Sequence, residues 1–268
     1  MDNKRIEKYK PKIVLTFDDG RKDNYRVATE VLQPRNLTAA FSITTGYVDG
    51  SIQKANRPEN NAALTQDKVK ALYATGQFEI VGHGHEHLNT LEDWEKGLDM
   101  LEQWLGESWR AHGVGIASPH SVMSSKQIRE WEVTLTHLNV KYVRIALKNQ
   151  FNYLQRIISK IARMTHNTFL YTLPIKSSLQ YVGKEKVVYS VPVLHPDTVK
   201  QVIALINMAE REQRDCVLML HSILKDGEAN YNSMWTWDYN RFVKLCDFLV
   251  EERNANRIDI VTLRELFD

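Results

Sequence analysis

Short apolar runs rich in β-branched residues alternate along this chain with longer segments of helical periodicity, and this alternation limits the fold more than any other feature. A strand that is apolar throughout is buried on both faces, as in parallel sheets covered by helices. About seven strand-helix units favour a closed barrel over an open sheet. We therefore predict an α/β fold, a (β/α) barrel of about seven parallel strands. The predicted strands are Lys12–Phe17, Thr38–Ile43, Phe78–Val81, Gly113–Ala117, Tyr142–Ala146, Val187–Val191 and Cys216–Leu220, with a last short run at Ile258–Val261.

Helical segments follow most of these runs, and the chain is predicted to form one domain over residues 1–268. Two stretches break the rhythm. Gly46–Asn61 is polar and is predicted to be a loop, and residues 147–186 form an insertion longer than a barrel connection requires. The predicted helices are Asp23–Leu32, Ala63–Thr75, Leu91–Leu105, Ser124–Leu138, Pro196–Arg211 and Trp237–Glu252.

The insertion contains a basic amphipathic segment. Apolar residues recur at helical spacing from Phe151 to Met164, and Lys148, Arg156, Lys160 and Arg163 take much of the remaining face. Such a helix could lie on an anionic membrane. We prefer a helix packed on the barrel with a solvated basic face, because soluble helices commonly show this pattern.

Composition excludes several classes of protein. The 268 residues are 43% hydrophobic and 25% charged with a net charge of +2, which is typical of a soluble globular protein and calls for no nucleic acid partner. No apolar run is long enough to span a membrane. Met1–Lys8 is polar and does not resemble a signal peptide, so we expect a cytoplasmic protein, or an exported one if a leader has been trimmed. The oligomeric state does not follow from the sequence.

Polar side chains stand directly after three of the predicted strands. Asp18 and Asp19 end the first strand and precede Gly20, and His221 ends the Cys216–Leu220 run. The carboxyl ends of barrel strands form one face, where barrel enzymes keep their chemistry. If Asp19 binds a metal ion, Asp18 can act as a base on the water that the ion binds. His221 is then a candidate general acid for a leaving amine.

Three histidines follow the Phe78–Val81 strand within five residues. His83 and His87 are four residues apart and can reach one ion if the loop makes a helical turn, whereas His85 would point elsewhere, although the spacing does not exclude it. Two histidines and a carboxylate leave open positions on a divalent metal for water and substrate. We expect one such ion, with zinc as the first choice and cobalt, nickel or manganese as alternatives.

These motifs resemble the polysaccharide deacetylase family, also called the NodB-homology domain or carbohydrate esterase family 4. Thr16–Gly20, His83–His87 and Val217–Ser222 are similar to three of its motifs in order and separation. The resemblance implies a distorted barrel of about seven strands, with Asp19, His83 and His87 as metal ligands. It also implies Asp18 as catalytic base and His221 as catalytic acid.

Two other motifs depart from the family pattern. Many members carry Arg-Pro-Pro-Tyr or Tyr-Pro-Tyr-Gly where this chain has Ser118–Ser121, so the arginine that often holds the catalytic aspartate is missing. The aspartate and tryptophan of the fourth motif are absent near Ser190–Val193. We expect a base and an acid with less support, and hence low activity or an unusual substrate. The backbone N–H of His120 is a candidate oxyanion donor.

The function predicted is metal-dependent removal of an N-acetyl group from an amino sugar or glycan. Trp235 and Trp237 are candidates for an apolar wall against a sugar ring, with membership of the core as the alternative. Two other functions stay open. One is allantoinase-like hydrolysis of a small cyclic or linear amide, and the other is a degenerate carbohydrate-binding barrel without turnover.

Overall fold

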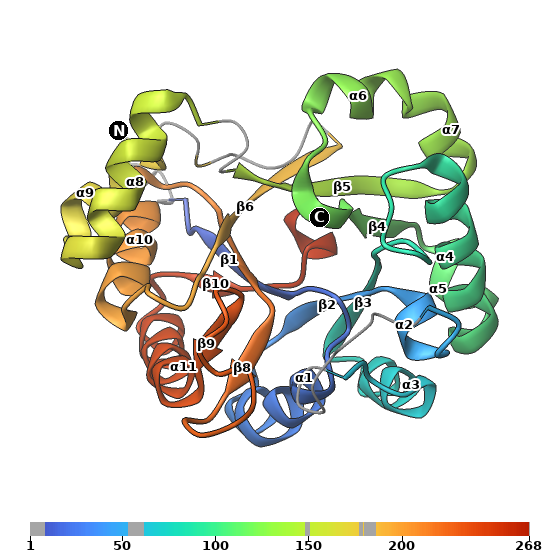
Figure 1. Ribbon diagram of the computed structural model, residues 1–268, viewed down its shortest axis with the longest axis horizontal. Helices are drawn as coiled ribbons and strands as arrows, with labels where there is room; N and C mark the ends of the chain where they lie inside the picture. The colour runs from blue at the N-terminus through green and yellow to red at the C-terminus, as the bar shows by residue number, and fades with distance from the viewer. Residues whose placement is uncertain (1–8, 53–61, 148–150, 177–178, 180–185, 268) are drawn as a thin grey trace, which may run out of the picture.

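A computed structural model describes residues 9–52, 62–147, 151–176, 179 and 186–267. Its main sheet is parallel and closes on itself because β1 pairs with both β2 and β7, which confirms the predicted barrel (Figure 1). The order around the sheet is β10-β1-β2-β3-β4-β5-β6-β7. The strands are β1 Lys12–Phe17, β2 Ala39–Ile43, β3 Phe78–Gly82, β4 Val114–Ala117, β5 Val140–Ala146, β6 Val187–Pro192, β7 Cys216–Leu220 and β10 Asp259–Ile260.

Strand β10 shares one edge of β1 with β2. Lys12 and Ile13 pair with Asp259 and Ile260, whereas the later residues Thr16 and Phe17 pair with β2. The opposite edge of β1 pairs with β7 along most of its length. The short last strand therefore satisfies backbone groups of β1 that β2 does not reach, and the seven longer strands form the barrel.

Helices cover the outside of the barrel, and their bounds differ from the predicted ones at several places. The Asp23–Leu32 segment begins as an α-helix and continues as a π-helix over Val27–Leu32. The Ser124–Leu138 helix is divided at Trp131, and part of the predicted Gly46–Asn61 loop is helical, while residues 53–61 lie outside the described residues. The helices are α1 Lys22–Arg26, α2 Thr45–Val48, α3 Gln66–Ala74, α4 Leu91–Leu105, α5 Glu107–Ala111, α6 Ser125–Glu130, α7 Glu132–His137, α8 Tyr153–Thr165, α9 Thr168–Thr172, α10 Val199–Glu212 and α11 Tyr239–Asn254.

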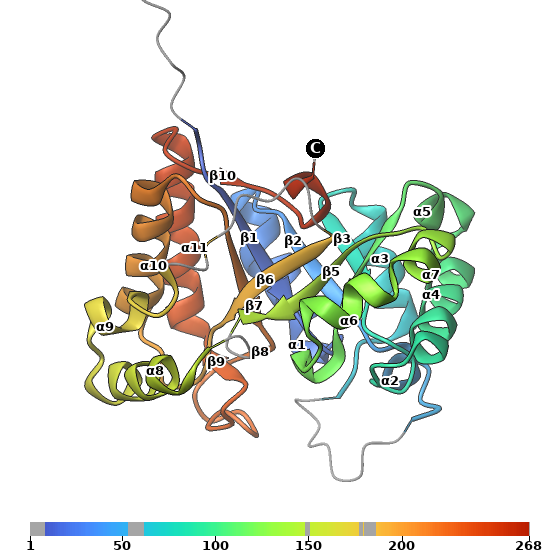
Figure 2. The same cartoon turned by 90° about the horizontal axis from the view of Figure 1, so that it is seen from above.

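A second, two-stranded sheet follows β7. Strands β8 Ser222–Leu224 and β9 Thr236–Asp238 pair in parallel, and Figure 2 shows them extending from the same end of the barrel as α8. The predicted Trp237–Glu252 helix begins only at Tyr239, because Asp238 caps it through a carboxylate that accepts the backbone N–H of Arg241. Trp237 consequently belongs to a strand.

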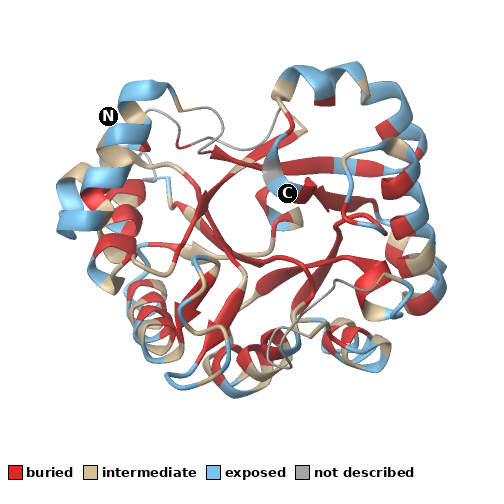
Figure 3. Ribbon diagram, in the orientation of Figure 1, coloured by how far each residue is buried: buried red, intermediate tan, exposed pale blue. Residues whose placement is uncertain are grey.

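The core has two parts. Large side chains fill the space between the strands and the helices, and Figure 3 shows the strands buried and the outer helix faces exposed. Smaller residues such as Val14, Ala40 and Val81 line the inside of the barrel together with Tyr142. Tyr142 fits there because Gly115 has no side chain, since a Cβ at Gly115 would lie 2.0 Å from the ring.

The Phe151–Met164 helix of the insertion was predicted to pack its apolar face on the barrel, and the structure differs. Ala162 of α8 is buried, but Leu154, Ile157, Ile161 and Met164 are exposed. Residues 148–150, 177–178 and 180–185 of the insertion lie outside the described residues. Among the helices of the described residues, none combines the length and the hydropathy that crossing a bilayer requires.

Candidate metal and catalytic site

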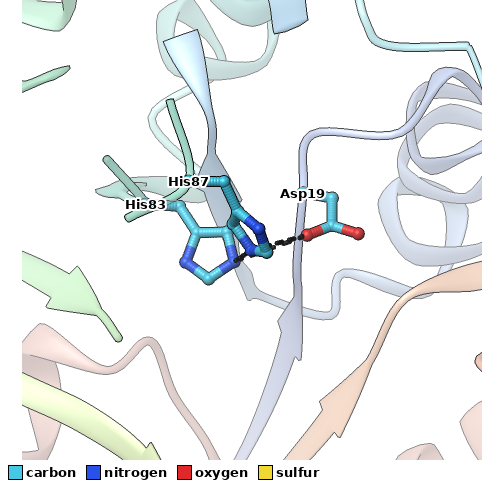
Figure 4. A group of neighbouring side chains, drawn as sticks. All are labelled: Asp19, His83 and His87. Carbon is cyan, nitrogen blue, oxygen red and sulfur yellow. Dashed lines mark hydrogen bonds and ion pairs between the residues drawn. The ribbon is translucent and has the colours of Figure 1, made fainter. Parts of the chain in front are cut away.

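Asp19, His83 and His87 converge at the carboxyl ends of β1 and β3 (Figure 4). The Nε2 atoms of the two histidines are 3.1 Å apart. The Asp19 Oδ1 atom lies 3.5 Å from Nε2 of His83 and 3.4 Å from Nε2 of His87. All three side chains are buried, so three potential ligand atoms form a nearly equilateral triangle inside the protein.

This triangle fits a divalent ion. For metal–ligand bonds of about 2.1 Å, the corners of a tetrahedral site lie about 3.4 Å apart, and the three measured separations are close to that value. Two imidazole nitrogens and one carboxylate oxygen are ligands that zinc accepts. The donor set therefore suits one small divalent ion with open positions for other ligands.

Neighbouring groups orient two of the three candidate ligands. Nδ1 of His83 lies 2.7 Å from the Ala117 carbonyl oxygen, so it carries the proton and leaves Nε2 as the acceptor. Arg21 donates to Oδ2 of Asp19 from Nη2 at 2.7 Å, which leaves Oδ1 facing the histidines. Burial raises the pKa of Asp19, but His83 and Arg21 outweigh it and hold that pKa well below its usual value. The carboxylate is therefore ionised, as a metal ligand must be.

The loop between the two histidines is fixed by Asp93 of α4. Its carboxylate accepts the backbone N–H groups of Glu86 at 2.6 Å and Leu88 at 2.8 Å. Gly84 adopts a left-handed conformation with φ +73°, and a Cβ there would lie 2.1 Å from Oδ2 of Asp93. The close approach of Gly84 to Asp93 folds the loop so that His83 and His87 face the same point.

The middle histidine faces away from this triangle. The Nδ1 atom of His85 lies 3.0 Å from the Thr45 hydroxyl and its Nε2 lies 3.4 Å from the Ser51 hydroxyl. Glu86 is exposed. The structure thus brings together the pair that is four residues apart and leaves His85 with α2 and the segment that follows it.

Asp18 is held by an arginine that sequence analysis did not identify. Nη2 of Arg144, a fully buried residue of β5, donates to Oδ1 of Asp18 at 2.7 Å and to Oδ2 at 2.6 Å. Burial raises the pKa of Asp18, but Arg144, with help from His83 and His221, lowers it below its ordinary value. The expectation that Asp18 has less support is wrong, because β5 supplies an arginine that holds it although Ser118–Ser121 contains none.

A sequence signal for Arg144 was present. Arg144 lies in the run Tyr142–Ala146, in which all the remaining residues are apolar or aromatic. A charged side chain in a buried strand is costly unless it is paired, so a lone arginine there indicates a buried carboxylate partner. Its partner lies 126 residues away in sequence, and the spacing of residues does not reveal it.

His221 lies beside the two aspartates and packs against Trp235, with ring centroids 4.5 Å apart. Burial lowers the pKa of His221 to about 4, even though the two aspartates raise it. The buried Nδ1 atom has no hydrogen-bond partner within the described part of the chain. The ring is therefore neutral at pH 7, and the structure places no carboxylate on Nδ1 to orient it.

The other two candidates, Trp237 and His120, lie in different parts of the structure. Trp237 is buried in the core and its Nε1 donates to the Asp197 carbonyl at 2.7 Å, so of the two positions predicted for it the structure shows the core and not a sugar-facing wall. His120 has a left-handed backbone with φ +51°, and its ring centroid lies 4.3 Å from that of His87. The segment around His120 thus borders the metal triangle.

The family comparison agrees with this geometry. A model of the polysaccharide deacetylase family matches residues 5–130, which include Asp18, Asp19, His83 and His87. Over these residues the chain is similar to the polysaccharide deacetylase family. The match ends before Arg144 and His221, so the positions of those two residues come from the structure alone. No curated protein matches the sequence.

Several solved structures show similarity to this chain at low sequence identity. A 4-alpha-glucanotransferase from Thermococcus litoralis has a TM-score of 0.50 at 13% identity and covers 96% of this chain and 40% of its own. The Xyl-CE4 domain of a multidomain xylanase from the hindgut metagenome of Trinervitermes trinervoides has a TM-score of 0.40 at 15% identity. The match covers 96% of this chain and 89% of that domain. A de-N-acetylase from Aggregatibacter actinomycetemcomitans has a TM-score of 0.40 at 16% identity, covering 50% of this chain and 63% of that one. The present chain thus spans less than two thirds of the de-N-acetylase chain.

Proposed function

We propose that this protein is a metal-dependent hydrolase that removes an N-acetyl group from an amino sugar or glycan. The observation that carries the proposal is the pair of adjacent carboxylates with separate partners. Asp19 faces His83 and His87, whereas its neighbour Asp18 faces Arg144. One carboxylate is therefore available to an ion and the other to a proton, which amide hydrolysis requires.

Asp19, His83 and His87 would hold the ion, for which we propose zinc. The bound ion would supply a Lewis acid next to the amide carbonyl. Asp18, kept ionised and fixed by Arg144, would take the proton of the attacking water. The His120 backbone N–H would donate to the developing oxyanion, in the segment that borders His87.

His221 would protonate the leaving amine. Because its pKa is about 4, it is neutral in the free protein, and the proton that it passes to the amine would come from the attacking water by way of Asp18. Trp235, which packs against the His221 ring, is the proposed aromatic contact for the sugar.

The alternatives explain the geometry less well. A degenerate binding barrel was suggested only by the missing arginine, and Arg144 now holds Asp18 instead. An allantoinase-like hydrolase would use the same ion and base, so only the substrate separates it from a deacetylase.

The test is a comparison of substrates with protein loaded with zinc. Acetate release from N-acetylglucosamine oligomers would be measured alongside ring opening of allantoin, with Asp18→Asn as the inactive control. We expect acetate release that the control lacks. Turnover of allantoin without release of acetate would reject the deacetylase proposal.

A further inference from the structure

Helix α8 presents a continuous apolar stripe to solvent. Tyr153, Leu154, Ile157, Ile161 and Met164 are all exposed, and Met164 retains 73% and Leu154 63% of their surface. At 100° per residue these five positions fall within an arc of about 100° on one side of the helix. Phe169 of α9 is 69% exposed and extends the apolar surface beyond the end of α8. Figure 3 shows both helices largely exposed on the rim of the molecule.

The contacts of α8 fix this stripe outward. Ala162, on the opposite side of the helix, is buried, and its carbonyl accepts a hydrogen bond from the Gln201 amide at 2.9 Å. Arg163 forms an ion pair with buried Asp197 at 2.8 Å. These contacts anchor the helix to α10 and to the segment before it, so the stripe cannot turn inward without breaking them.

The charges beside the stripe have one sign. Arg156, Lys160 and Arg163 lie along one flank of α8, between the stripe and the buried face. The sequence contains no aspartate or glutamate from Val133 to Lys184. Because Arg163 is paired with buried Asp197, Arg156 and Lys160 supply the net positive charge of this flank. An extended apolar surface with a cationic flank is complementary to a surface that is apolar inside and anionic outside.

The cationic flank faces the mouth of the barrel. Arg156, Lys160 and Arg163 line a cavity of about 450 Å³ whose other walls include Val191 and Pro192 at the carboxyl end of β6. Figure 2 shows α8 at the same end of the barrel as β8 and β9. A surface bound to α8 would therefore lie beside the end of the barrel that carries the candidate site.

We propose that α8 and α9 form a docking surface for an anionic lipid membrane, with the apolar stripe inserted between the lipids and the cations against their headgroups. A second copy of this chain fits less well, because pairing two α8 stripes would bring two cationic flanks together. The proposal does not depend on the proposed deacetylase activity.

The experiment is co-sedimentation of the full chain with vesicles. Vesicles containing phosphatidylglycerol would be compared with vesicles of phosphatidylcholine alone. We expect binding to the anionic vesicles only, weakened by salt. Lys160→Glu should lower the affinity by about fivefold or more, as expected for a charge at an anionic surface. Lys70→Glu, an exposed lysine of α3, is the charge-matched control and should bind as the unaltered protein does.

The double variant Leu154→Ser and Met164→Ser should abolish binding, whereas Val133→Ser, which removes a residue 71% exposed on α7, should not. Thermal melts would verify that all variants are folded, which their exposure favours. Failure of the folded wild type to sediment with anionic vesicles would overturn the proposal, as would undiminished binding of the double variant. If the wild type binds no lipid but forms a dimer, and the double variant does not form that dimer, the surface would instead bind a second copy of the chain.

Discussion

Arg144 and Asp18 form a fully buried ion pair, 2.6 Å from Nη2 to Oδ2, between the middle of β5 and the end of β1. Nη1 of the same guanidinium donates to the Ser190 hydroxyl at 3.1 Å. The arginine is therefore fixed by a neighbouring strand while it holds the proposed base. This pair lies beside the Asp19 triangle and gives the two adjacent aspartates different environments.

The first prediction concerns Arg144. Arg144→Gln leaves Asp18 as an unpaired buried charge, so the protein should lose about 3 kcal/mol of stability. Turnover should fall by about 10²-fold or more because the base is no longer held in place. Since Arg144 lowers the pKa of Asp18, its removal should move the acidic limb of the rate profile to higher pH. Rates of the wild type and of Arg144→Gln would be measured from about pH 3 to 8, a range that brackets the usual carboxyl pKa. The control is Arg110→Gln, which changes an arginine of α5 that pairs with Asp99 and Glu102 of α4. An unshifted acidic limb in a folded variant would contradict this role.

The second prediction concerns metal binding. His83→Ala and His87→Ala should each remove one corner of the triangle and lower the affinity for zinc by at least about 10²-fold. His85→Ala should retain the metal because that ring contacts Thr45 and Ser51. Calorimetric titration of zinc into each purified variant measures this. Loss of the metal in His85→Ala alone would show that the ligand assignment is incorrect.

The third prediction separates metal binding from proton transfer. Asp18→Asn should keep the zinc, since Asp18 faces Arg144, but turnover should fall by about 10²-fold or more, the usual cost of a lost general base. Asp19→Asn should instead weaken zinc binding. Metal content and acetate release, measured on the same samples, distinguish the two variants. Unchanged turnover in Asp18→Asn would exclude it as the base.

The fourth prediction uses the pKa of His221. Burial lowers it to about 4 from an unfolded value of 6.5, so folding favours the neutral ring. The unfolded chain then binds the proton first as pH falls, and this group should cost stability between pH 6.5 and 4, by up to about 3 kcal/mol. Urea unfolding of metal-free wild type and His221→Gln across that range measures the difference. A constant difference in unfolding free energy would refute the lowered pKa.

The fifth prediction concerns Asp23, whose contribution to stability should change with pH in the direction opposite to that of His221. Burial raises the pKa of Asp23 to about 6 from 3.8, although the backbone N–H of Ile223 donates to its Oδ2 at 2.7 Å. The ionised form is disfavoured in the folded state, so the contribution of Asp23 to stability should fall as pH rises from about 4 to 6, by up to about 3 kcal/mol. Relative to the wild type, Asp23→Asn should gain stability over this range. The same urea series tests it, and a relative loss would disprove it.

Local sequence determined much of the architecture. The bounds of β1 and β7 match the predicted Lys12–Phe17 and Cys216–Leu220, because runs that are apolar throughout have few alternatives to a buried parallel strand. The sequence also predicted which end of the barrel carries the candidate site, since polar residues directly after parallel strands lie together at one end of a barrel. The spacing of His83 and His87 indicated which two imidazoles could share an ion, and Asp93 and Gly84 fold the loop accordingly.

Only the tertiary structure decided the features that depend on contacts between residues distant in sequence. Periodicity assigns residues to faces but does not state which strands meet, so the pairing of Arg144 with Asp18 and the burial of Trp237 appear only once the barrel closes. The orientation of α8 was predicted wrongly, because periodicity reveals an apolar stripe but not whether the stripe faces the barrel or solvent. Burial of Ala162 and the Arg163–Asp197 ion pair turn that stripe outward. The free energy of these long-range contacts, rather than any local preference of the chain, sets the form of the candidate site and the surface beside it.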